Sequence, residues 1–252
     1  MRGWKIFTHS AGLVFRNFDA ALRISLLPFG AHILSQAWLA GHPELVAMPT
    51  ELGGELPQVE PLTYTVFFVL QIASLVASLW IAVAWHRYVL TEEMGKGWVP
   101  VFRGDLVLGY LGRSVLLGLL MLLALVTAAI PAGMLMTAMP FATIPLLLAC
   151  LYAALYLFFR LGVILPAGAI GQRITLQAAW QATGREQGAI LGLALVVVGI
   201  MSVMFILSIV TQSMSPSVAG IFGLIFGWVA TMVGASLLTS LFGICVEQRS
   251  ID

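Results

Sequence analysis

Residues 188–245 read GAILGLALVVVGIMSVMFILSIVTQSMSPSVAGIFGLIFGWVATMVGASLLTSLFGIC and contain no Asp, Glu, Lys or Arg. A helix needs roughly 20 apolar residues to cross the hydrocarbon core of a bilayer. The stretch is long enough for two such helices, at 188–211 and 218–245, of which the second is long enough to require tilt. It therefore predicts a pair of membrane-embedded helices joined by the short link 212–217.

Four more apolar runs precede this stretch, at about 24–41, 62–85, 115–137 and 141–160. The first is the weakest, because serine, proline, histidine and glutamine dilute it. Of the 252 residues, 60% are hydrophobic and 9% are charged, whereas a soluble domain normally has about a quarter charged residues. We therefore expect an all-α integral membrane protein, with one membrane domain over residues 1–252 and six transmembrane helices.

All twelve Lys and Arg residues fall on one side of the membrane once these spans are marked. The connections 42–61, 138–140 and 212–217 contain none of them, and the first is expected to be an extended outer loop. By the positive-inside rule, the chain is predicted to be a multi-pass protein of the cytoplasmic (inner) membrane with both termini in the cytoplasm. Twelve basic and seven acidic residues give the inner side a net charge of +5, and four glutamates give the outer side −4.

A basic inner face attracts anionic lipid headgroups, by about 1 kcal/mol for each basic residue near the surface. The alternative is that these charges only orient insertion of the chain. The residues predicted to contact headgroups of the inner leaflet are Lys5, Arg16, Arg87, Arg103, Arg160, Arg173 and Arg185.

The lengths of the links group the six spans into three helical hairpins, each preceded by a cytoplasmic segment too polar to cross. Residues 3–19 place apolar and aromatic side chains on one helix face and basic ones on another, as in an interfacial amphipathic helix. The inner surface segments 86–114 and 161–187 are expected to hold similar helices, at 98–113 and 172–187. A degenerate threefold repeat of surface helix plus hairpin is therefore predicted.

Arg160 lies within a long apolar run, and an arginine inside the membrane is a candidate functional residue. Counting about 20 residues from Phe141 ends the span at Arg160, whose long side chain can then reach the headgroups. We expect this arrangement, with residues 161–171 following the inner interface. A truly buried arginine is the alternative.

Residues 160–198 carry a local pattern: an arginine that ends a span, a proline six residues later, and a surface helix with a tryptophan and a threonine. These are Arg160, Pro166, Leu176, Ala179, Trp180 and Thr183. The pattern resembles the membrane-domain family of glycerophosphoryl diester phosphodiesterases and the related six-span bacterial membrane proteins. The chain departs from it at Gly171, where the family often has an acidic residue, and at Ala179, where it often has serine. The resemblance implies a membrane module without the hydrolase activity, since no segment is polar enough to fold a soluble catalytic domain.

Side chains capable of catalysis are sparse. The four histidines, at positions 9, 32, 42 and 86, cannot be grouped at metal-ligand spacing, and no nucleophile or phosphate-binding motif occurs. We therefore expect no catalytic residue, no metal, no cofactor and no enzymatic activity. Nucleic acid is not an expected partner, because the net charge of the chain is only +1.

Two spans carry polar side chains at matching depth: His32 and Gln36 on the first, and Gln71, Ser74 and Ser78 on the second. Hydrogen bonds between the spans would explain them. The alternatives are a polar path for a solute or lipid and a proton-sensing His32. The absence of Asp and Glu from every span argues against proton-coupled transport.

Small residues recur along one side of the last span, at Gly220, Gly223, Gly227 and Gly234. Such a pattern is typical of close helix packing. The packing partner is either within the chain, a second copy in a homo-oligomer, or another membrane protein.

The leading hypothesis is a non-enzymatic module of the cytoplasmic membrane that engages lipid, a protein partner or both, for membrane organisation or as a scaffold or accessory subunit. The alternative is a small transporter or channel for a solute or lipid, with a polar path between the first two spans.

Overall fold

The computed structural model describes residues 2–46 and 58–250, with side chains left undescribed at 130–132, 134–138 and 140. In these ranges the chain forms helices and connecting segments, and no strand occurs. Five stretches are long and apolar enough to cross a membrane: Pro61–Thr91, Gly104–Ala129, Thr143–Ala169, Leu176–Met214 and Pro216–Cys245. The protein is therefore an all-helical, multi-pass membrane protein.

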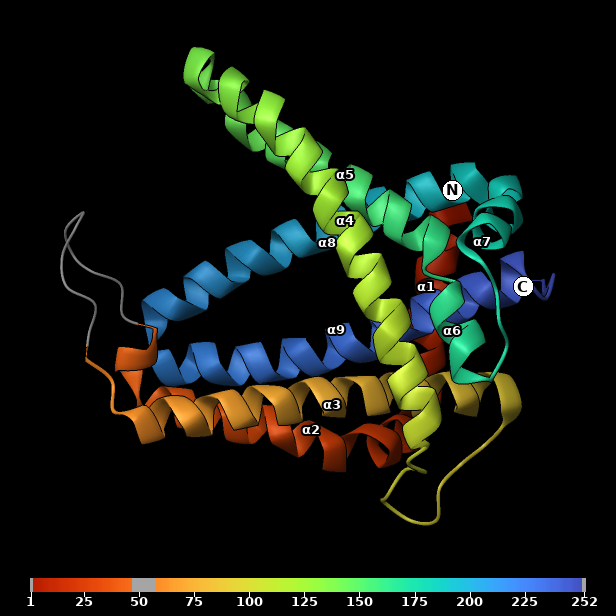
Figure 1. Ribbon diagram of the computed structural model, residues 1–252, viewed down its shortest axis with the longest axis horizontal. Coiled ribbons are helices and arrows are strands. Elements are labelled where there is room, and N and C mark those ends of the chain that lie inside the picture. The colour runs from red at the N-terminus through yellow and green to blue at the C-terminus, as the bar shows by residue number, and fades with distance from the viewer. Residues whose placement is uncertain (1, 47–57, 251–252) are drawn as a thin grey trace.

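Helix α2, Phe18–Gly41, is not among these five stretches. Its polar residues lower its mean hydropathy, as the sequence analysis anticipated for the weakest span. It nevertheless packs along α3, Pro61–Thr91, over an extended contact (Figure 1). The count of six crossings thus stays a prediction, whereas the pairing of α2 with α3 is observed.

Helix α1, Arg2–Arg16, precedes α2 and runs crosswise to the long helices α8 and α9, on which it packs (Figure 1). It is shorter than the expected 3–19, because the chain turns at Asn17. Its buried face consists of Gly3, Ile6, Ser10 and Val14, not of the aromatic residues, and Trp4 is half exposed. The small residues Gly3 and Ser10 face α8 and α9 because a close crossing of helices needs little side-chain volume.

The expected surface helix at 98–113 does not form. Residues 92–103 form a connection, and α4 then runs without a break from Gly104 to Ala138. Val107 and Tyr110 in its first turns are buried, and α4 packs on α3 and on α6, Ile164–Ala169. The apolar side of this segment is therefore covered by protein, which explains why it continues the helix instead of lying on a membrane surface.

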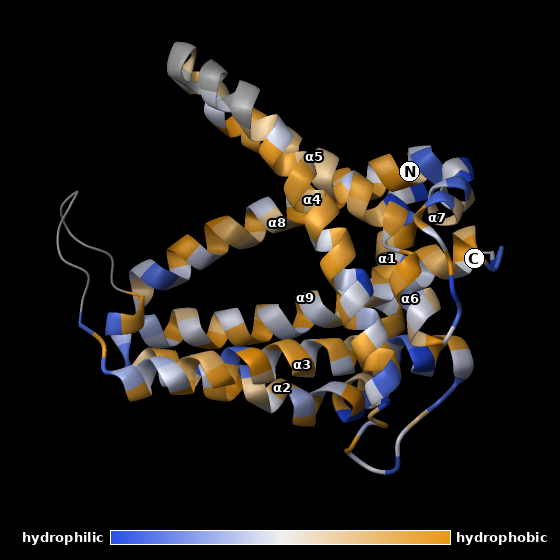
Figure 2. Ribbon diagram, in the orientation of Figure 1, coloured by the Kyte–Doolittle hydropathy of each residue, from blue (hydrophilic) through white to orange (hydrophobic). Residues whose placement is uncertain are grey.

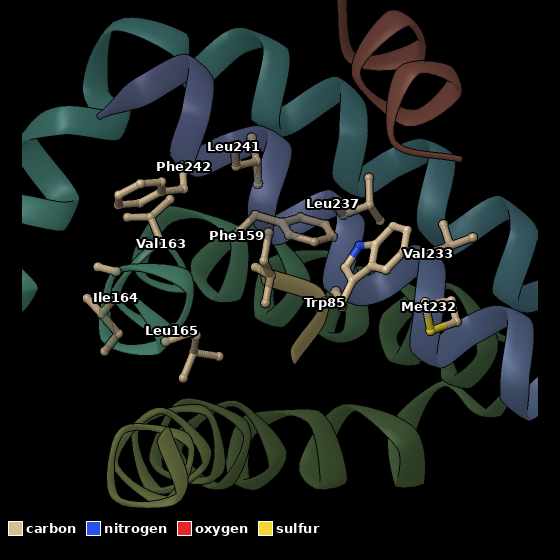
Figure 3. Close-up of a cluster of buried hydrophobic side chains, with 14 of the residues drawn as sticks. Trp85, Phe159, Val163, Ile164, Leu165, Met232, Val233, Leu237, Leu241 and Phe242 are labelled. Carbon is tan, nitrogen blue, oxygen red and sulfur yellow. The ribbon is translucent and has the colours of Figure 1, made fainter. Parts of the chain in front are cut away.

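Helix α5, Thr143–Leu161, leads into α6, and all six residues of α6 are buried. The expectation that residues 161–171 follow the inner interface stays a prediction, but α6 is covered by protein, since it packs against α3, α4 and α9. Figure 3 shows Val163 beside Phe242 of α9, with Ile164 and Leu165 among the same buried hydrophobic side chains. An apolar segment that ends a span can turn inward because neighbouring helices bury it as well as lipid does.

The chain then forms α7, Leu176–Ala182, a short 3-10 turn at Thr183–Glu186, α8, Gln187–Met214, and α9, Pro216–Cys245. Two further 3-10 turns, Pro43–Leu45 and Pro140–Ala142, lie in the connections. Ser215 caps α9 by accepting a hydrogen bond from the Val218 amide at 3.2 Å, and Pro216 at the first helical position needs no such acceptor. Helix α4 packs on α5, and α8 packs on α9.

We call the end of the molecule that holds both chain termini, the connection 92–103 and α7 the basic end (Figure 1). The core lies there: residues 235–245 of α9 are all buried, whereas none of residues 216–231 is. Away from this end, α4 and α5 lean outward, and the ribbons of α4 and α8 are coloured largely as hydrophobic (Figure 2). Exposed apolar residues there include Leu119, Leu122 and Leu195. The exposed surface is 14558 Å², against about 11,000 Å² for a soluble monomer of this mass. A large surface that is apolar along α4 and α8 suits contact with lipid.

Candidate functional site

Arg160, at the end of α5, is buried among groups of the surface segment α7. Only 3% of the residue is exposed. Its Nε donates to Thr183 Oγ1 at 2.9 Å, its Nη1 to the Tyr156 hydroxyl at 2.7 Å, and its Nη2 to the Trp180 carbonyl at 2.8 Å. The guanidinium also lies 3.8 Å from the centre of the Trp180 ring, a cation–π contact that gains strength where water is excluded.

The prediction that Arg160 reaches the lipid headgroups is therefore wrong, and the buried alternative is observed. The physical reason is that the chain returns to Arg160 at residues 180–183 and offers two oxygen acceptors and an aromatic face, while Tyr156 of α5 itself offers the third acceptor. The planar guanidinium can satisfy several acceptors at once, so it fastens α7 to the end of α5. Three residues of the local motif, Arg160, Trp180 and Thr183, are thus brought into one cluster.

Arg87 and Arg103 are also held by protein groups. Both bind the Glu93 carboxylate, Arg103 at 2.8 Å, and Arg87 also donates to the Ala169 carbonyl at 3.1 Å. Partial burial tends to raise the pKa of Glu93, but the hydrogen bonds from Arg103 and Arg87 outweigh it and hold the pKa below its ordinary value. Arg87 links the connection 92–103 to the end of α6, whereas the Arg103 side chain is still 49% exposed beside Glu93. Headgroup contact by these two arginines stays a prediction.

The other four predicted headgroup residues, Lys5, Arg16, Arg173 and Arg185, are exposed at the basic end. We call these four side chains the basic surface. Exposed indole rings accompany them: Trp4 is 52% exposed and Trp180 is 42% exposed. Indole rings concentrate at membrane–water interfaces, so the composition of this surface suits lipid headgroups.

Polar side chains of α2 and α3 meet between the two helices. His32 Nε2 lies 3.0 Å from Ser78 Oγ, and Ser35 donates to Gln71 Oε1 at 2.7 Å. Ser74 is buried at the same contact, whereas Gln36 is exposed and makes no side-chain hydrogen bond with the described residues. The structure thus brings together His32, Gln71 and Ser78, adds Ser35, and leaves Gln36 outside.

A second buried network of hydrogen bonds was not predicted from the sequence. His86 Nδ1 lies 2.7 Å from Thr239 Oγ1, and its Nε2 lies 3.2 Å from the Tyr110 hydroxyl. Because Thr239 donates to the Ala235 carbonyl at 2.8 Å, it must accept from Nδ1–H, and Tyr110 then donates to Nε2. This neutral chain ties α3, α4 and α9 together. No spacing in the sequence indicated it, since its members lie on three different helices.

The glycines predicted to pack closely, Gly220, Gly223, Gly227 and Gly234, have open space where a Cβ would be. No close contact within the described chain therefore uses them. The close approach occurs at Gly3 instead, where an added Cβ would lie 2.6 Å from the Gly192 carbonyl carbon. The part of the chain searched for metal ligands holds no group of three His, Cys, Asp or Glu suited to an ion.

Comparison of the chain with models of known protein families, with curated proteins and with solved structures gave no match. The resemblance of residues 160–198 to the phosphodiesterase membrane domains therefore stays a prediction.

Proposed function

We propose that this protein is a non-enzymatic module of the cytoplasmic membrane whose basic surface binds anionic lipid headgroups. One observation carries the proposal. Helix α1 is fixed to α8 at Gly3, and α7 is fixed to the end of α5 by Arg160. The cations of the basic surface lie on α1 (Lys5 and Arg16) and on either side of α7 (Arg173 and Arg185), and all four are exposed. Rigid placement of cations at one end lowers the entropy lost when headgroups bind.

The positions of the two termini support an orientation in which the basic end faces the cytoplasm. Both lie at the basic end (Figure 1), and α2 accompanies α3 along its length, as six crossings would require. The positive-inside rule then assigns this end to the cytoplasm, where the leaflet carries anionic lipid. Each exposed cation near that surface is worth about 1 kcal/mol, or about fivefold in association.

A protein partner with an acidic surface would use the same cations. Lipid is the favoured ligand, because Trp4 and Trp180 are exposed beside them and indole rings settle at the bilayer interface. The transport alternative draws less support from the geometry. His32 and Gln71 bond to serines of the facing helix, so their polar groups hold α2 to α3 instead of lining a path.

Electron paramagnetic resonance of spin-labelled lipids tests the proposal. The protein is reconstituted in phosphatidylcholine, and the motionally restricted fractions of labelled phosphatidylglycerol and phosphatidylcholine are compared. We expect a preference for phosphatidylglycerol that decreases with salt, because exposed charges are screened. The variant with Gln at Lys5, Arg16, Arg173 and Arg185 should lose most of it, on the order of tenfold in relative association.

The matched control exchanges Lys5 for Arg and the three arginines for Lys, which keeps every charge. It should retain the preference. Equal restriction of both lipids by the unaltered protein would refute the proposal.

A further inference from the structure

A cavity of about 290 Å³ opens at the basic end between α1, α3, α9 and the chain that follows α9. Its polar lining includes His9, Ser240 and Arg249, and its apolar lining includes Leu13, Leu90 and Ile244. It lies beneath the amphipathic helix α1, at the last turns of α3 and α9. A cavity with a polar wall and an apolar wall suits an amphipathic ligand.

The polar side of the cavity offers donors more than acceptors. Three of the last four carbonyls of α9 are already used: Phe242 O accepts from the Val246 amide at 2.8 Å, Gly243 O from the Arg249 amide at 2.9 Å, and Cys245 O from the Gln248 side chain at 3.0 Å. The Arg249 guanidinium contacts Glu247 through Nε at 2.7 Å. Its two Nη groups make no hydrogen bond to the described residues and remain able to donate.

The charge of the cavity suits a singly charged anion. Glu247 offsets part of the Arg249 charge. Burial first, and the charge of Arg16 second, lower the pKa of His9, so its imidazole is neutral at pH 7 and donates through one nitrogen. A phosphodiester carries one negative charge, whereas inorganic phosphate carries more at this pH and would meet too little positive charge.

The apolar side of the cavity suits the apolar part of the ligand. Leu13 of α1, Val89 and Leu90 of α3 and Ile244 of α9 line it, next to the helices that enter the membrane. The glycerol and first acyl carbons of a phospholipid would contact these side chains, and each buried CH₂ contributes about 0.8 kcal/mol.

We propose that this cavity binds the phosphodiester of a phospholipid, with the Nη groups of Arg249 and the His9 ring donating to its oxygens. The inference deepens the proposed function and rests on it for lipid headgroups being present at the basic end. It adds a defined site for one lipid to the diffuse attraction of the basic surface.

The test is native mass spectrometry of delipidated protein titrated with phosphatidylglycerol at high salt, which suppresses the diffuse attraction. We expect one tightly held lipid per chain. The double variant His9→Gln with Arg249→Gln should weaken it at least tenfold. Gly243→Leu should abolish it by filling the cavity, because a Cβ there meets only the Arg249 Cδ at 3.5 Å.

Matched controls are Lys96→Gln, an exposed cation outside the cavity, and Gly188→Leu, where an added side chain meets open space. Both should bind as the unaltered protein does. Retention of the lipid by both cavity variants would overturn the inference. Binding of inorganic phosphate or glycerol 3-phosphate as tight as that of phosphatidylglycerol would overturn the assignment to a phospholipid.

The variant with four Gln substitutions on the basic surface separates the two proposals. This variant should still bind the lipid in the cavity. It should lose the preference for phosphatidylglycerol over phosphatidylcholine among the lipids that surround the protein. Loss of the cavity lipid in this variant would contradict a separate site, whereas a missing preference in the unaltered protein would contradict only the basic surface.

Discussion

Arg160 donates through all three of its nitrogen atoms to neutral acceptors, and Trp180 covers its face. A buried cation is costly unless its donors are satisfied, so this cluster decides how the chain after α5 is placed. Counting apolar residues cannot reveal it, because Thr183 lies 23 residues beyond Arg160.

Arg160→Lys separates a buried clamp from a side chain that reaches the headgroups. A single ammonium group lacks the planar fork that reaches Thr183, Tyr156 and Trp180 together. Hydrogen bonds to charged groups are worth about 1.5–3 kcal/mol each, so we expect a loss of about 2 kcal/mol in stability. Thermal unfolding in mild detergent, followed by tryptophan fluorescence, measures it.

Arg173→Lys is the control, since Arg173 is exposed and should tolerate the change. Unaltered stability of Arg160→Lys would mean that the charge alone matters, as it does for a residue that reaches the headgroups.

At the scale of single elements, α4 and α6 show why surface segments are hard to assign. Residues 104–113 have the polar and apolar faces expected of an interfacial helix, yet Val107 and Tyr110 are buried against protein. An apolar helix face is satisfied equally by lipid and by another helix. The pattern therefore indicates the face but not its partner.

Helix α1 depends on the absence of a side chain at Gly3. A Cβ there would collide with backbone atoms of Gly192 and Leu193 on α8, which cannot move aside as a flexible side chain could. We expect Gly3→Ala to cost about 1–3 kcal/mol, as overpacking does, and to release α1. Hydrogen–deuterium exchange of the α1 amides should then speed up.

Gly12→Ala on the same helix is the comparison. Its Cβ would meet only the Arg16 side chain at 3.4 Å, and alanine favours helix over glycine. If the α1 amides exchanged at the same rate in both variants, the close crossing with α8 would not be what holds this helix.

For the molecule as a whole, packing is concentrated at the basic end. Figure 3 shows α9 side chains from Met232 to Phe242 meeting Trp85 and Phe159 there, whereas the far halves of α8 and α9 expose apolar residues such as Phe205 and Ile225. Lipid can cover these residues without any protein partner, since a bilayer is as apolar as their side chains.

Six crossings predict which side of the membrane each connection occupies. In a chain with Cys150 and Cys245 changed to Ala, Glu60→Cys should react with an impermeant maleimide in intact cells. Lys5→Cys and Lys96→Cys should react only after permeabilisation, because six crossings and the positive-inside rule predict that the basic end faces the cytoplasm. All three native side chains are exposed, so access is not limited by burial. Labelling of Lys5→Cys in intact cells would mean that α2 does not cross.

The sequence by itself determined the class of protein, a multi-pass helical membrane protein, and it predicted that the basic residues lie on one side of the membrane. Long apolar runs must be helical in a bilayer, because every backbone group has to be hydrogen-bonded within its own segment. For the same reason residues 188–245 indicated two helices, and α8 and α9 are observed there.

Tertiary structure alone decided which polar groups meet. It buried Arg160 under Trp180, paired Arg87 with Glu93, and joined His86 to Tyr110 and Thr239. It also placed a close helix crossing at Gly3 and none at the glycines of α9 predicted to pack. These outcomes depend on distances between helices far apart in the chain, which periodicity and span length do not encode.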